Sequence, residues 1–167
     1  MVPSSVEESD CDEPNPAKRA VLLARKKAED VFHQHSDAYV IGCDTLVVAE
    51  DGTLLEKPVD RKEAKEMIEM QRGHTSIVHS GLCVFAPGGE SAEGLSSSSV
   101  LFKNLSDDEV QWWLDTDLWQ DRSGSFQIDG KGQMMIERIE GDWPGIVGLP
   151  VYLLGELLKQ VGYPGEF

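Results

Sequence analysis

The stretch that decides the fold is residues 40–58, which read VIGCDTLVVAEDGTLLEKP. Apolar runs on both sides of Asp44 predict a buried strand over residues 38–48. The Asp51-Gly52 pair predicts a hairpin turn, so the chain should fold back and bring Lys57 toward the end of the sheet that carries Asp44. An ionised carboxylate inside a buried strand is costly unless it has a partner. Asp44 is therefore the first residue that needs an explanation.

Apolar periodicity and capping residues predict the other elements in an interleaved order. Helices are expected over residues 17–32, after Asp60, after a capping box at 106–109 and from Pro150 onward, and strands over 77–85, 98–102 and 134–139. The Gly- and Ser-rich segment 86–98 is interpreted as a solvated hairpin end. Helices and strands alternate without a strict βαβ rhythm, which predicts an α/β fold with a mixed β-sheet and helices packed on it.

The composition limits the classes of protein to consider. A chain of 167 residues fits one domain with a substantial core. The net charge of −15 argues against a general nucleic-acid-binding surface, which needs an excess of Lys and Arg. No apolar run is long enough to span a membrane, and the acidic N-terminus lacks the apolar core of a secretory signal, so a cytoplasmic protein is expected. The three cysteines share no metal-ligand spacing.

Residue types alone make Asp44 and Lys57 candidates for phosphate and metal chemistry. A positioned carboxylate can hold a cation or accept a proton, and a lysine can bind a phosphate. Simpler interpretations stay open, because backbone N–H groups can satisfy Asp44 and Lys57 can be a solvated surface lysine. Glycines around Asp129 would allow a ligand to approach the backbone closely, but an Asp-Gly hairpin turn explains the same letters.

Five blocks of the sequence, taken in order, resemble the Maf-like (septum-formation-like) family of nucleoside triphosphate pyrophosphatases. The blocks are VPSSVEES at 2–9, LARKKA at 23–28, VIGCDT with the hairpin and EKP at 40–58, SGSFQIDGKG at 123–132, and EGDWPGIVGLP at 140–150. The resemblance covers nearly the whole chain. It implies a single Maf-like domain over residues 1–167, with an elongated mixed β-sheet, flanking helices and a cleft between two lobes.

The resemblance also implies an enzyme that splits a nucleoside triphosphate into the monophosphate and pyrophosphate, with a divalent cation, Mg²⁺ or Mn²⁺. By the same resemblance, Asp44 is the general base for the attacking water, and Glu8 and Asp44 hold the cation. Lys27 and Lys57 hold the triphosphate. The expected partner is thus a nucleoside triphosphate, with no nucleic acid and no membrane, and the family suggests a homodimer.

Two positions match those that tune the choice of base in the family, and they favour different substrates. Asp44 followed by Thr45 is similar to the branch that acts on dTTP and UTP. The block GSFQIDG, with Asp129, is closer to the branch that acts on 7-methyl-GTP. Because an acid can accept hydrogen bonds from the N1–H and amino group of guanine, the sequence slightly favours a purine or a modified base.

The sequence departs from the family pattern at its start. The family's LASxSPRR segment, whose Ser and Arg contact the phosphates, has no counterpart in these 167 residues. An N-terminally truncated domain of this kind is expected to bind triphosphates weakly or to be poorly soluble. The alternative function is accordingly a catalytically impaired nucleotide-binding or regulatory protein related to septum formation.

Overall fold

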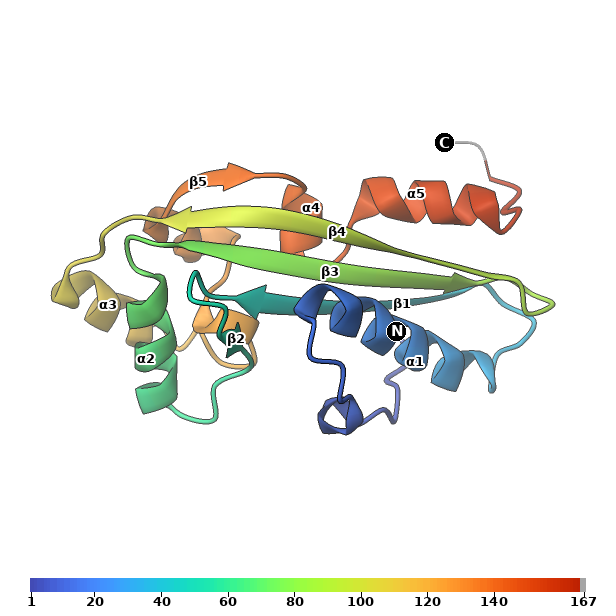
Figure 1. Ribbon diagram of the computed structural model, residues 1–167, viewed down its shortest axis with the longest axis horizontal. Helices are drawn as coiled ribbons and strands as arrows, with labels where there is room; N and C mark the ends of the chain where they lie inside the picture. Colours follow the sequence, from blue (N-terminus) through green and yellow to red (C-terminus); the bar gives the residue numbers. More distant parts are fainter. Residues whose placement is uncertain (166–167) are drawn as a thin grey trace. The chain divides into compact units, whose positions relative to one another are not determined.

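The computed structural model describes residues 1–165 and contains a five-stranded β-sheet with helices packed on it (Figure 1). Short 3₁₀ helices are labelled η. In chain order the elements are η1 (Glu8–Asp10), α1 (Pro16–Phe32), β1 (Val40–Val48), β2 (Leu54–Leu55), α2 (Arg61–Gln71), β3 (Thr75–Phe85), β4 (Ser91–Phe102), α3 (Asp107–Leu114), η2 (Ser123–Ser125), η3 (Gly130–Met135), β5 (Ile136–Glu140), α4 (Trp143–Val147) and α5 (Val151–Gln160).

The strands lie in the order β2-β1-β3-β4-β5, and the α/β class with flanking helices is confirmed. The β1–β2 and β4–β5 pairs are antiparallel, and the arrows in Figure 1 show that β1, β3 and β4 also alternate in direction. The sheet is therefore antiparallel, where a mixed one was expected from the sequence. Parallel neighbours need a crossover connection, whereas β1 and β2, and β3 and β4, are joined by short hairpin turns.

Local capping signals place the helix starts where the sequence predicts them. The Asn15 side chain caps α1, and Asp60 caps α2 by accepting a hydrogen bond from the Glu63 backbone N–H at 2.8 Å. Ser106 and Glu109 form the predicted capping box of α3. Each side chain satisfies a backbone N–H that a helix leaves without an internal partner.

The segment 86–98 was expected to be a solvated hairpin end, but only its first residues form the turn. Strand β4 already begins at Ser91. Its first residues alternate between exposed and half-buried positions. A strand needs backbone partners and one covered face, and polar residues can occupy the other face. This part of β4 is rich in Ser, Glu and Gly, so a search for apolar periodicity does not detect it as a strand.

The chain forms two compact units, each assembled from segments that are far apart in the sequence. The first consists of Met1–Thr45, His79–Ser96 and the chain from Gly148 onward, and the second of Leu46–Val78 and Ser97–Val147. In the first unit, α1 covers one face of the strands through a cluster of apolar residues, and α5 covers the other face through a second cluster. The α1 cluster contains Ala24, Ala28, Val40, Cys83 and Phe85, and the α5 cluster contains Leu82, Val84, Ala86, Leu157 and Val161.

The second unit has its own core between its strands, α2, α3 and the 3₁₀ segments. Trp113 and Phe102 are its largest fully buried side chains, and the Trp113 indole donates to the Ser125 carbonyl at 2.8 Å. The expected single domain and the cleft between two lobes stay predictions. Across residues 1–165, every helix is too short or too polar to cross a membrane.

Candidate active site

Three of the residues singled out in the sequence meet at one point of the first unit. The Lys27 ammonium, from α1, donates to Asp44 Oδ1 at 2.5 Å and to Glu8 Oε1 at 2.7 Å. Asp44 lies in β1 and Glu8 begins η1, so three separate elements supply the cluster. We call Glu8, Lys27 and Asp44 the carboxylate–lysine cluster. It answers the problem posed by the buried Asp44, because a cation pairs with it directly.

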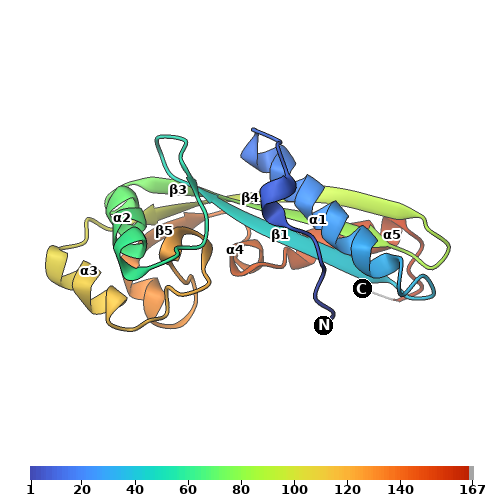
Figure 2. The ribbon, with the colours of Figure 1, turned by 90° about the horizontal axis from the view of Figure 1, so that it is seen from below.

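The cluster forms where α1 packs against β1, and the two elements lie side by side in Figure 1 and Figure 2. Gly42, two residues before Asp44 and on the same face of the strand, has no side chain, and a Cβ there would stand 2.3 Å from the Ala24 carbonyl oxygen. Ala28, one turn after Ala24, contacts the same glycine. Lys27 lies between these two alanines in sequence, and the close approach brings its side chain to Asp44.

Burial differs within the cluster. The side chains of Asp44, Lys27 and Glu8 are 5%, 22% and 44% exposed, so the cluster opens toward solvent on the side of Glu8. Burial lowers the pKa of Lys27, but its hydrogen bonds and charge interactions with Asp44 and Glu8 outweigh burial and raise that pKa above its ordinary value. Lys27 therefore stays protonated at neutral pH.

Thr45 and Cys43 lie on the opposite face of β1, because side chains alternate along a strand. The Thr45 and Ser80 hydroxyls share a hydrogen bond of 3.0 Å, and the Cys43 thiol donates to the Gly148 carbonyl at 2.8 Å. Burial raises the pKa of Cys43 to about 11, so this thiol is neutral at physiological pH. Thr45 is held by a buried partner on β3 rather than pointing freely into solvent.

Lys57 and Asp129 belong to the second unit. Lys57 is exposed in the segment between β2 and α2. Asp129 is half-buried and immediately precedes η3, so the sequence around it forms a 3₁₀ helix and not an Asp-Gly hairpin. Their roles in substrate binding stay predictions.

Two further residues support the site and were not singled out from the sequence. Arg19 of α1 donates to the Glu8 carbonyl at 3.3 Å and so holds η1, and Ser80 contacts Thr45 as described. Arg19 lies about two helical turns before Lys27, on the same side of α1. The spacing of these two residues in the sequence could have suggested this relation. Ser80 gives no signal of its own, because nothing in the sequence of β3 distinguishes it from Ser76.

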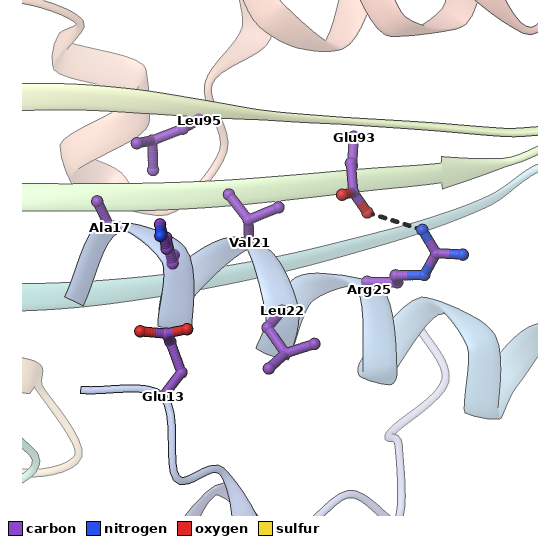
Figure 3. A pocket seen from close by; sticks show the side chains of 8 residues that line it. Glu13, Ala17, Val21, Leu22, Arg25, Glu93 and Leu95 are labelled. Atoms are coloured by element: carbon purple, nitrogen blue, oxygen red, sulfur yellow. Dashed lines mark hydrogen bonds and ion pairs between the residues drawn. The ribbon is translucent and has the colours of Figure 1, made fainter. Parts of the chain in front are cut away.

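The first unit also has a surface groove of about 380 Å³ between α1 and β4 (Figure 3). Its floor is apolar, and an ion pair of 3.1 Å between Arg25 and Glu93 closes one end. The lining residues are Glu13, Ala17, Lys18, Val21, Leu22, Arg25, Glu93 and Leu95. None of them belongs to the carboxylate–lysine cluster.

The chemistry of the cluster suits a divalent cation bound with substrate. Among the side chains that the structure describes, no three His, Cys, Asp or Glu residues form a group that could enclose a metal ion. Mg²⁺ usually binds proteins through one or two carboxylates and takes its other ligands from water and phosphates. Glu8 and Asp44 already converge on one cation, the Lys27 ammonium, which shows that this donor set fits a positive charge.

Comparison with known proteins identifies the family. The model of the Maf-like protein family matches residues 1–161. The chain belongs to this family. This Maf-like chain is 41% identical to a dTTP/UTP pyrophosphatase of Deinococcus radiodurans over 158 residues, which cover 95% of this chain and 80% of the relative.

Other relatives agree. A dTTP/UTP pyrophosphatase of Treponema denticola is 38% identical, with 96% of this Maf-like chain and 85% of the relative covered. One of Pyrococcus furiosus is 35% identical, with 94% and 82% covered. All three alignments extend over nearly the whole chain, so the resemblance seen in the sequence blocks is confirmed at the level of the family.

Proposed function

We propose that this protein hydrolyses a nucleoside triphosphate of the dTTP/UTP type to the monophosphate and pyrophosphate. The observation that carries the proposal is the carboxylate–lysine cluster, in which Lys27 pairs with both Asp44 and Glu8 in a member of the Maf-like family. The names of the relatives support a pyrimidine substrate, and this preference replaces the slight preference for a purine that Asp129 suggested.

In the proposed reaction, Asp44 accepts the proton of the water that attacks the triphosphate. The Asp44 side chain is buried and ion-paired with Lys27, so it is positioned before substrate binds. The anhydride between the α and β phosphates breaks, and pyrophosphate leaves. Lys27 and Lys57 attract the phosphate oxygens as point charges. Glu8 and Asp44 would hold a divalent cation, Mg²⁺ or Mn²⁺, and its positive charge would stabilise the negative charge that develops in the transition state.

Partners and location complete the proposal. The net charge of −15 supports a small-molecule substrate over nucleic acid, since the long-range field of the chain repels a polyanion. We also propose a homodimer that acts in the cytoplasm. Gel filtration with light scattering measures the oligomeric state and so tests the homodimer directly.

The test is release of pyrophosphate from dTTP, UTP, GTP and 7-methyl-GTP with Mg²⁺ or Mn²⁺. Asp44→Asn should lower kcat by about 10²–10⁴, the range for loss of a general base. Asp37→Asn, an exposed residue just before β1, is the matched control and should keep wild-type activity. Binding of dTTP without hydrolysis by the wild-type chain would instead favour the impaired nucleotide-binding or regulatory protein.

A further inference from the structure

The Lys27 ammonium lies where the proposed function requires a divalent cation. It contacts one oxygen of Asp44 at 2.5 Å and one of Glu8 at 2.7 Å, and these are the two carboxylates assigned to the metal. An ammonium and a metal ion within a few ångströms of each other repel strongly at the low effective dielectric constant of a partly buried site. The two carboxylates therefore favour one cation at a time.

We propose that Lys27 acts as an internal stand-in for the metal and competes with divalent cations for the carboxylate pair until a triphosphate binds. The inference rests on the proposed function and adds an order of events to it. A triphosphate offers Lys27 other anionic oxygens, and the flexible four-carbon stem of the lysine lets its ammonium reach them. When the ammonium turns to the phosphates, Glu8 and Asp44 become available to the cation that accompanies the nucleotide.

The burial of the three side chains supports this order. Asp44 is almost fully buried, so leaving it without a cation would be costly, whereas paired with Lys27 it is stable in the absence of substrate. Lys27 keeps 22% exposure and Glu8 44%, which leaves both side chains a solvent-facing route for rearrangement. The pair thus stays neutralised at each stage, first by the lysine and then by the metal.

The direct test is Mn²⁺ affinity of the nucleotide-free protein, measured by electron paramagnetic resonance or calorimetry. Lys27→Met removes the ammonium and keeps an unbranched side chain only one atom shorter. Mn²⁺ should therefore bind about tenfold tighter or more than to the wild type, the size expected for one charged hydrogen bond. Lys26→Met is the control, because it removes the same charge from the adjacent helix position, which points about 100° away. It should change the affinity less than about threefold, through long-range charge alone.

Equal or weaker Mn²⁺ binding by Lys27→Met than by Lys26→Met would overturn the proposal. Lys27→Gln gives a second comparison if Lys27→Met does not fold. The wild type supplies a third readout: saturating Mg²⁺ should shift the side-chain nitrogen resonance of Lys27, assigned with Lys27→Arg, and an unchanged resonance with Mg²⁺ bound contradicts a displaced lysine. These measurements use no substrate, so pyrophosphate release from dTTP tests the proposed function separately.

Discussion

Gly42 of β1 and Ala24 of α1 lie so close together that a single methyl group at Gly42 would overlap the Ala24 carbonyl oxygen, at 2.3 Å. Gly81 of β3 has the same relation to Ala20, at 2.2 Å. Two glycines on neighbouring strands therefore let one helix settle directly on the sheet. This approach sets the position of Lys27 relative to Asp44, and it links a packing feature to the proposed chemistry.

Gly42→Ala should move α1 away from the strand. Overpacking against backbone costs about 1–3 kcal/mol of unfolding free energy, and the shift should separate Lys27 from Asp44 and lower kcat on dTTP. Gly94→Ala is the control, since its added Cβ would meet only the flexible end of Leu153. Urea unfolding and pyrophosphate release measure the two effects. Wild-type stability of Gly42→Ala would mean that α1 is not tightly packed here.

Lys57→Met should weaken substrate binding more than catalysis. If Lys57 holds a phosphate, losing one charged contact should raise KM for dTTP by about tenfold, with a smaller change in kcat. Lys62→Met is the matched control, because Lys62 is an exposed lysine of α2 that pairs with Glu66. Steady-state kinetics of both variants measure KM and kcat for dTTP. Equal KM values for the two variants would mean that Lys57 is a surface lysine without a role in substrate binding.

Cys43 should resist alkylation at neutral pH. Burial raises its pKa to about 11 from the ordinary value near 9, so below pH 11 the folded protein holds the unreactive thiol form. At pH 8 the native thiolate fraction is about a hundredfold below that of an ordinary cysteine. Iodoacetamide labelling of Cys43, mapped by mass spectrometry, should speed up about tenfold per pH unit toward pH 11.

The same shift has a consequence for stability. A raised native pKa means that the thiol contributes stability below pH 9 and loses it as pH rises from about 9 to about 11, because the unfolded chain releases its proton first. The control for the iodoacetamide labelling of Cys43 is the protein unfolded in urea. Native Cys43 that reacts at pH 8 as fast as in the unfolded chain would contradict the buried environment and its bond to Gly148.

Trp113→Phe should destabilise the second unit. Trp113 is fully buried, and its indole N–H donates to the carbonyl of Ser125, a residue with a positive φ of 58° just before the segment that carries Asp129. Losing that bond leaves a buried carbonyl unsatisfied at a cost of about 1–3 kcal/mol. Trp112→Phe, next to it and 37% exposed, should change stability by less than about 0.5 kcal/mol. Urea denaturation of both variants tests the difference.

Local signals in the sequence determined the elements. The apolar runs around Asp44, the Asp51-Gly52 turn and the caps at Asp60 and Ser106 each act within a few residues, so they predict a strand, a hairpin and two helix starts without knowledge of the rest. The family blocks pointed to Glu8, Lys27 and Asp44 for the same reason, because each block is a short stretch with its own pattern.

Only the tertiary structure determined which of these residues contact one another. Whether Lys27 or its neighbour Lys26 reaches Asp44 depends on the rotation of α1 over Gly42 and Gly81, and that rotation is set by backbone contacts between segments far apart in the sequence. The start of β4 at Ser91 and the pairing of Thr45 with Ser80 are also long-range facts. Residue patterns report burial and turn chemistry, but only the packed chain fixes which polar groups come within hydrogen-bond distance.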